Sequence, residues 1–319
     1  MRNVRLIFLI AILLISVLCA NYVFAGTEAI QCVAQNFIHA DTERYSYEIN
    51  AKRDLLSLMM AYPEYIKGVE RGEDGLIYIV MQSGASILYD DKKQKSYEQK
   101  LADADIEDTL EMLYPIEDIS SLMEGNFDPG RIRSYSLLRE VYGASKEAIE
   151  GNLSGTGLGS GSGLFNKQNG ALQALQEAFK RVSDICAADT SVYGFVYPLG
   201  GTYNYRHIAG TGRLSPHAFG IAIDLHSAPE DYWRWASRDK GQRRLDSYPR
   251  ELVRAFEDCG FVWGGKWAHF DILHFEYRPE IINKAKYYKE PKFGQAWYYG
   301  FPKNEQTKRF IEIIDEAFE

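Results

Sequence analysis

The segment GIAIDLH, residues 220–226, places the strongest local constraint on how this chain folds. Its side chains alternate, with Ile221, Ile223 and Leu225 on one face and Ala222, Asp224 and His226 on the other. A period of two residues predicts a β-strand with one buried face. The carboxylate of Asp224 is therefore expected to project to one defined side of a sheet.

Other segments predict short strands and amphipathic helices. Strands are expected over 192–198, 261–265 and 273–277, a hairpin over 75–91, and helices over 52–63, 101–115, 172–186, 248–260 and 308–318. A turn at 128–130 is expected to lead into a further helix that ends at Gly143. Because strands and helices do not alternate regularly, we expect an α+β fold with a small antiparallel sheet and flanking helices. The glycine- and serine-rich stretch 151–163 is expected to be a flexible loop or linker.

The N-terminal residues have the pattern of a targeting segment. A basic start, MRNVR, precedes the apolar run LIFLIAILLISVL, and small residues lead to Ala25. This order is typical of a secretory signal peptide, although residues 6–25 are also long enough for an uncleaved membrane anchor. Both readings predict a protein body outside the cytoplasm. We expect an accessory segment of unknown role over 26–125 and the functional domain with a C-terminal helix over 126–319.

Charge and cysteine content exclude several classes of function. The net charge of −8 becomes −10 without residues 1–25, which argues against a nucleic-acid partner. Contact with a membrane is expected only through an N-terminal anchor. Cys32, Cys186 and Cys259 follow that segment without C-x-x-C spacing, so no thiolate metal site is indicated. Cys186 and Cys259 could pair, but small buried side chains are the favoured interpretation.

Five of the six histidines fall between residues 207 and 274. A catalytic zinc ion commonly takes three protein ligands and keeps one position for water. Asp224 on its strand, His217 seven residues earlier and His274 from a distant segment are the candidate ligands. His226 shares the face of Asp224 and is an alternative to His217. A further possibility is a structural metal site with four protein ligands, one of them His226 or His269, and no position for water.

Two linked motifs resemble the LAS zinc peptidases, which include D-alanyl-D-alanine carboxypeptidases, L-alanyl-D-glutamate endopeptidases and the hedgehog signalling domain. The motif S-x-H-x-x-G-x-A-x-D begins at Ser215, and D-x-x-H-F-E begins at Asp271. The resemblance covers about residues 193–278 and is greatest to the carboxypeptidase branch. It implies that the antiparallel sheet carries zinc bound by His217, Asp224 and His274.

The resemblance also implies roles for four other residues. Asp271 occupies the position of the catalytic carboxylate, where members of the family carry Glu or Asp, and its side chain is one methylene shorter than glutamate. Arg206 occupies the position of a substrate-binding arginine, for which Arg213 is a weaker substitute, and Ser215 is expected near the substrate. Glu276 is expected to orient a ligand histidine, with a role as the base less favoured. Arg131 or Arg133 could approach the substrate or only begin a helix.

These inferences lead to one main hypothesis and two alternatives. The main hypothesis is an exported zinc peptidase that hydrolyses peptidoglycan stem peptides, most simply as a D-alanyl-D-alanine carboxypeptidase. The first alternative is an L-alanyl-D-glutamate-type endopeptidase of the cell wall. The second is a zinc-binding module without catalysis, of the hedgehog type. The oligomeric state does not follow from the sequence.

Overall fold

The computed structural model describes residues 46–289 and 295–319. The chain divides into two compact units, residues 1–51 and residues 52–319. In the first unit the described residues, 46–51, are helical. The signal peptide or anchor expected over 1–25 lies outside the described residues. Among those that are described, no helix combines the length and the apolar character needed to cross a bilayer.

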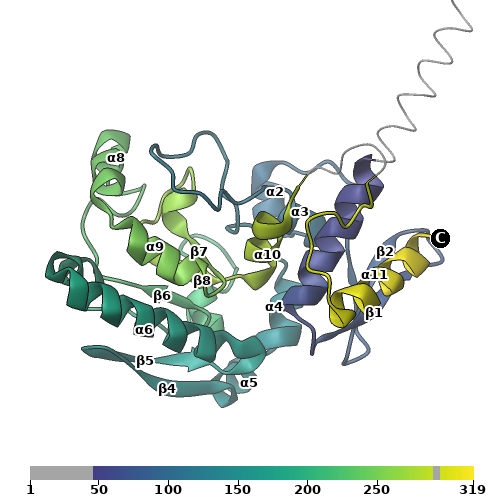
Figure 1. The fold of residues 1–319 in the computed structure, drawn as a ribbon, viewed down its shortest axis with the longest axis horizontal. Coiled ribbons are helices and arrows are strands. Elements are labelled where there is room, and N and C mark those ends of the chain that lie inside the picture. Colours follow the sequence, from purple (N-terminus) through teal and green to yellow (C-terminus); the bar gives the residue numbers. More distant parts are fainter. Residues whose placement is uncertain (1–45, 290–294) are drawn as a thin grey trace, which may run out of the picture. The chain divides into compact units, whose positions relative to one another are not determined.

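The second unit is an α+β fold with small antiparallel sheets and flanking helices, as predicted (Figure 1). The sheets are β1-β2-β3, β4-β5 and β6-β8-β7. Their strands are β1 Ile66–Arg71, β2 Ile77–Met81, β3 Ser86–Leu88, β4 Leu153–Leu158, β5 Gly161–Asn166, β6 Ala222–Asp224, β7 Phe261–Trp263 and β8 His274–Tyr277. The hairpin expected over 75–91 is formed by β2 and β3, and β1 extends it.

Helices surround these sheets. Residues 52–61 are helical. The helices that follow are α2 Tyr97–Ala102, α3 Ile106–Leu110, α4 Tyr135–Tyr142, α5 Lys146–Gly151, α6 Ala171–Ala188, α7 Tyr193–Val196, α8 Arg238–Ser247, α9 Arg250–Glu257, α10 Pro279–Tyr287 and α11 Glu305–Phe318. Helix α6 contacts both the β4-β5 hairpin and α9 (Figure 1).

The sheet β6-β8-β7 carries the core of the unit. Its central strand β8 pairs with β6 and β7, so that Phe275 lies opposite both Ile223 and Trp263. All three side chains are fully buried. The ring of Phe256 from α9 stacks on Phe275 with centroids 4.2 Å apart. Burial of large apolar and aromatic surfaces on this sheet holds the polar ends of its strands in fixed positions.

Buried polar contacts join the first described helix of the second unit to the C-terminal elements. Arg53 donates hydrogen bonds to the carbonyls of Tyr287, Trp297 and Tyr299, and only 2% of this residue is exposed. Tyr62 donates to a carboxylate oxygen of Glu280 at 2.7 Å. The elements between residues 52 and 125 are therefore packed with the rest of one compact unit.

The prediction of a loop over 151–163 was wrong, because this stretch forms most of the β4-β5 hairpin. The strands bury Leu158 and Phe165. Gly163 lies so close to Thr202 that an added Cβ would be 2.5 Å from its hydroxyl oxygen. The small residues therefore permit close packing here, whereas the composition alone suggested flexibility.

Two further local predictions were wrong. In place of the strand expected over 192–198, a 3-10 helix ends at Val192 and the short helix α7 follows over Tyr193–Val196; Val192 and Val196 are both buried. The single helix expected over 101–115 is broken between α2 and α3. There the side chain of Asp105 accepts a hydrogen bond from the backbone N–H of Asp108 and begins α3 anew.

Cys186 and Cys259 are free thiols, and both are half-buried. They do not form a disulfide bond with each other. The favoured interpretation of small buried side chains holds in part, because both residues are only half-buried. Cys32 lies outside the described residues.

Candidate metal centre

The register of the central sheet brings Asp224 and His274 together. In the antiparallel pair β6-β8 these two residues are direct cross-strand partners. Side chains at such positions project to the same face of a sheet. The alternation that placed Asp224 on one face of its strand thus also determines which side chain of β8 it meets.

A tight turn adds His217 to this pair. The 3-10 helix Pro216–Phe219 begins at Ser215, whose hydroxyl accepts a hydrogen bond from the N–H of His217, and ends at Gly220 with φ +68°. A Cβ at Gly220 would lie 2.5 Å from the side chain of Leu153, so the turn requires glycine for space as well as conformation. The chain then enters β6 with the imidazole of His217 beside Asp224.

The three side chains form a compact group of metal-binding atoms. One nitrogen of His217, one of His274 and a carboxylate oxygen of Asp224 all lie within 4.8 Å of one another. The oxygen Oδ1 of Asp224 is 3.3 Å from Nε2 of His217 and 2.9 Å from Nδ1 of His274. Ligands about 2.0–2.2 Å from a tetrahedral zinc ion are separated by ~3.4 Å, so the group fits zinc.

Both imidazoles are oriented by contacts on their far sides. Nδ1 of His217 lies 2.6 Å from the carbonyl oxygen of Thr202, which can only accept a hydrogen bond. Nδ1 therefore carries a proton, and Nε2 is free to bind a metal. Nε2 of His274 lies 3.7 Å from Glu276, so its Nδ1 faces Asp224. Partners of this kind set the tautomer and ring orientation of histidine ligands.

Glu276 is an ionised carboxylate held by two arginines. It is fully buried, receives hydrogen bonds from Nε and Nη2 of Arg133 at 2.6–3.1 Å, and lies 3.5 Å from Nη1 of Arg278. Burial disfavours its charge, but the charge and hydrogen bonds of Arg133 outweigh this and hold the pKa of Glu276 well below its usual range. The geometry favours the predicted orienting role over a role as the base. Sequence reasoning did not assign Arg133 to this partner.

The charge on His274 is balanced between two carboxylates. Burial disfavours the charged imidazole, but the hydrogen bond to Asp224 and the nearby carboxylate of Glu276 raise the pKa of His274 to about 10. A divalent ion bound at Nδ1 would displace that proton. The side chain of Asp224 remains 25% exposed, so the group is open to solvent on one side.

Asp271 lies beside the three residues without joining them. Its carbonyl oxygen accepts a hydrogen bond from the N–H of His274 at 3.1 Å. Burial and the negative charge of Asp224 raise the pKa of Asp271 to about 6, while the charge of His274 opposes this. A Cβ at Gly264 would lie 2.5 Å from the carbonyl oxygen of Asp271, so glycine allows the backbone to approach here.

Ser215 and Arg206 occupy neighbouring backbone positions. Ser215 is buried and caps the turn that carries His217. Its N–H donates to the carbonyl oxygen of Arg206 at 3.0 Å. The side chain of Arg206 is exposed and makes no hydrogen bond or ion pair to any described residue. The substrate roles of both residues stay predictions.

His226 and His269 do not belong to the group. Nδ1 of His269 lies 2.7 Å from the buried carboxylate of Asp128, which also accepts hydrogen bonds from Tyr97 and Arg131. Among the described residues, the group that contains His217 has three members. A closed site that includes His226 or His269 is therefore not formed.

Comparison with known proteins supports this description. No curated protein and no solved structure matched the chain. One family model, described as D-alanyl-D-alanine carboxypeptidase, matches residues 209–277. The match includes Ser215, the three candidate metal ligands and the Asp271–Glu276 motif, and it begins after Arg206. Residues 209–277 thus carry the sequence pattern of the D-alanyl-D-alanine carboxypeptidase family of zinc peptidases, as the resemblance indicated.

Proposed function

We propose that this protein is an exported, zinc-dependent D-alanyl-D-alanine carboxypeptidase that acts on peptidoglycan stem peptides. The observation that carries the proposal is the group formed by His217, Asp224 and His274, open on one side. Three ligands with room for another are the usual arrangement of catalytic zinc. The family match over residues 209–277 supports a metallopeptidase of this type.

A zinc ion at this group would supply Lewis-acid chemistry, lowering the pKa of a water molecule and polarising the peptide carbonyl. Asp271 would take a proton from the attacking water and return it to the leaving amine. Its absence from the three-residue group and its pKa raised to about 6 support this role.

The neighbouring residues would prepare the site for that step. Thr202 and Glu276 hold the two imidazoles in the orientation that presents one nitrogen of each to the metal. Arg206 offers a planar set of donors suited to the terminal carboxylate of the substrate or to the developing oxyanion. Its exposed side chain, without a partner among the described residues, is free to make that contact.

Export forms part of the proposal. The support is the pattern of residues 1–25, with a basic start followed by an apolar run and small residues before Ala25. Peptidoglycan lies outside the cytoplasm, so a peptidase that trims it has to be exported. Detection of the mature protein in culture medium or cell envelope, with N-terminal sequencing, tests this step and distinguishes a cleaved signal from a retained anchor.

The activity is tested with a pentapeptide that ends in D-Ala-D-Ala, using protein loaded with zinc. Mass spectrometry is expected to show release of one D-alanine by the wild-type protein and none by His217→Ala or Asp271→Asn. Arg309→Ala is a matched control, because Arg309 is exposed on α11 and makes no hydrogen bond or ion pair to a described residue.

Other products would contradict the carboxypeptidase assignment. Fragments cut between L-Ala and D-Glu would identify an endopeptidase. Full zinc content without any cleavage, together with a biological effect that survives Asp271→Asn, would identify a non-catalytic zinc module.

A further inference from the structure

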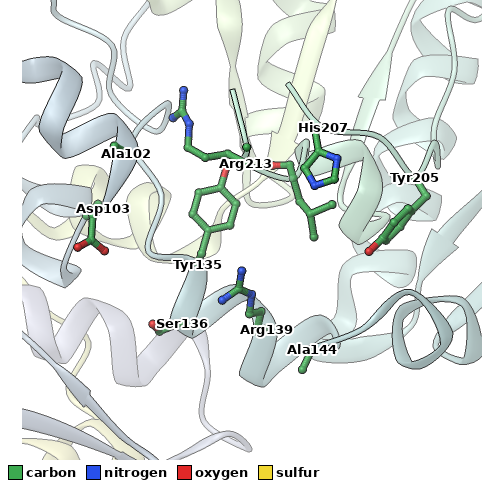
Figure 2. Close-up of a pocket in the computed structure, with 12 residues that line it drawn as sticks. Ala102, Asp103, Tyr135, Ser136, Arg139, Ala144, Tyr205, His207 and Arg213 are labelled. Carbon is green, nitrogen blue, oxygen red and sulfur yellow. Dashed lines mark hydrogen bonds between the residues drawn. The ribbon is translucent and has the colours of Figure 1, made fainter. Parts of the chain in front are cut away.

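A second feature with the character of a binding site is a cavity of about 500 Å³ (Figure 2). This volume lies within the range typical of small-molecule sites. The cavity is bounded by the end of α2, by α4 and by the segment from Tyr205 to Leu214. Its lining residues are Ala102, Asp103, Ala104, Tyr135, Ser136, Arg139, Ala144, Tyr205, His207, Gly212, Arg213 and Leu214. None of the three metal-binding residues lines it.

One wall of the cavity is continuous in sequence with the turn that carries His217. His207 and Leu214 are paired as an antiparallel bridge, and Ser215 pairs with Arg206 in the next position. His207 and Leu214 both line the cavity, whereas the adjacent pair Arg206 and Ser215 is not part of its lining. Ser215 begins the turn that holds His217. One short hairpin therefore contributes to the cavity and continues into the turn of the metal centre.

Positive charge collects in the cavity, although the chain as a whole carries −8. Figure 2 shows the guanidinium of Arg139 and the imidazole of His207 on opposite walls, both directed into the space between them. Arg139 is exposed and forms no ion pair within the described part of the chain. Arg213 is fixed by a hydrogen bond to the carbonyl of Leu101. The one acidic lining residue, Asp103, lies at the end away from His207.

Neutral polar groups complete the lining. The hydroxyl of Tyr135 donates to the carbonyl of Leu214 at 2.9 Å, so its proton is already used and it contributes no donor to an anion in the cavity. The hydroxyls of Ser136 and Tyr205 also border the space. Nζ of Lys146 lies 5.5 Å from the ring centre of Tyr205, and its charge is paired with Glu150 at 3.8 Å. An anion with several acceptor oxygens would find donors on more than one wall.

We propose that this cavity binds a carboxylate of the substrate peptide at an acidic residue remote from the bond that is cleaved, with Arg139 as the principal contact. This inference rests on the proposed function, because it assigns a second contact to the same peptide. The planar guanidinium of Arg139 suits bidentate binding of a carboxylate. Two observations support the assignment. Arg139 has no ion-pair partner among the described residues, and one short hairpin contributes to both the cavity and the metal centre.

The first experiment measures binding without catalysis. Isothermal titration compares two tripeptides that have no scissile D-Ala-D-Ala bond, acetyl-Ala-Glu-Lys-amide and acetyl-Ala-Gln-Lys-amide. We expect the wild-type protein to bind the glutamate peptide about tenfold more tightly. Arg139→Ala is expected to remove that preference, Arg139→Lys to retain part of it, and the control Arg309→Ala to retain all of it. Alanine is a good helix former, so the change is compatible with α4.

Two results of the titration would overturn the proposal. Equal affinity for both tripeptides in the wild-type protein would show that the carboxylate is not recognised. A preference that persists in Arg139→Ala would place the recognition elsewhere. Titration with inorganic phosphate is the third arm, and Arg139-dependent binding tighter than that of the glutamate peptide would assign the cavity to phosphate groups instead.

A second experiment distinguishes failure of this inference from failure of the proposed function. Pentapeptides that end in D-Ala-D-Ala, with Glu or Gln as second residue, are compared by kcat/KM. Release of D-alanine with equal kcat/KM for both peptides contradicts the cavity assignment and leaves the peptidase proposal intact. An Arg139-dependent binding preference without any release supports the cavity as a carboxylate site and contradicts the carboxypeptidase proposal.

Discussion

Replacement of Arg133 by methionine tests the interpretation of the buried charge network behind the metal centre. Methionine keeps most of the aliphatic volume but removes the hydrogen bonds to Glu276 at 2.6–3.1 Å. Both side chains are almost completely buried, with 5% and 0% exposed. Removal of one partner of a buried ion pair usually costs about 3–5 kcal/mol, since the other charge is left without compensation.

The structure places the expected cost of Arg133→Met at the lower end of that range. Arg278 stays 3.5 Å from Glu276 and would compensate part of its charge. We therefore expect the free energy of unfolding to fall by about 3 kcal/mol, which is a shift of roughly 1 M in the urea midpoint. Urea denaturation followed by tryptophan fluorescence measures this change. Arg309→Met is the control, with an expected change within about 0.5 kcal/mol.

A double variant separates loss of the pair from loss of packing. In Arg133→Met/Glu276→Met no carboxylate remains uncompensated, and Arg278 keeps its ion pair with Glu280 at 2.6 Å. We expect at least half of the lost stability to return. The reasoning is refuted if the single variant loses less than about 1 kcal/mol, or if the double variant is less stable than the single one.

Three further predictions address the site and the fold. His217→Ala removes one of three ligands and is expected to reduce zinc content, measured by mass spectrometry, to below about one tenth with an unchanged circular dichroism spectrum. Gly264→Ala places a Cβ 2.5 Å from the carbonyl oxygen of Asp271 and is expected to lower kcat about tenfold or more; Gly194→Ala, where a Cβ meets nothing within 4 Å, is the control and should leave kcat unchanged. Burial and neighbouring carboxylates raise the pKa of Glu107 to about 7. The folded protein therefore favours the protonated carboxyl, whose contribution to the free energy of unfolding is complete below the unfolded pKa of about 4.5 and is lost as pH rises through 7. Glu107→Gln is therefore expected to stabilise the protein by about 2 kcal/mol more at pH 8 than at pH 4, and equal stabilisation at both pH values in urea titrations would contradict this.

The sequence was most informative where side-chain pattern and local backbone determine each other. Alternation along 220–226 gave the strand β6 and the side of Asp224, and the turn before it needs Gly220. The two motifs then indicated that His274, on a separate predicted strand, shares a metal site with Asp224, and the structure pairs the two strands. These predictions depended on residues within a few positions of one another, or on a pattern shared with a known family.

Prediction failed where the outcome depends on distant contacts. The glycine-rich stretch 151–163 forms a hairpin because Leu158 and Phe165 are buried in the core, which composition does not reveal. The segment 192–198 has a strand-like composition, yet it is helical around two buried residues, Val192 at the end of a 3-10 helix and Val196 in α7. Such tertiary contacts outweigh intrinsic preferences of a few tenths of a kcal/mol per residue.

By itself, the sequence determined the class of the fold, the strand that carries Asp224 and the identity of the candidate zinc ligands. The tertiary structure decided two other features. Arg133 binds Glu276 although the two residues are 143 positions apart in the chain, and Arg139 and His207 line one cavity. The physical reason is the distance along the sequence over which each interaction acts. Side-chain alternation and turn conformation act between near neighbours, whereas charge compensation and cavities depend on how the whole chain packs.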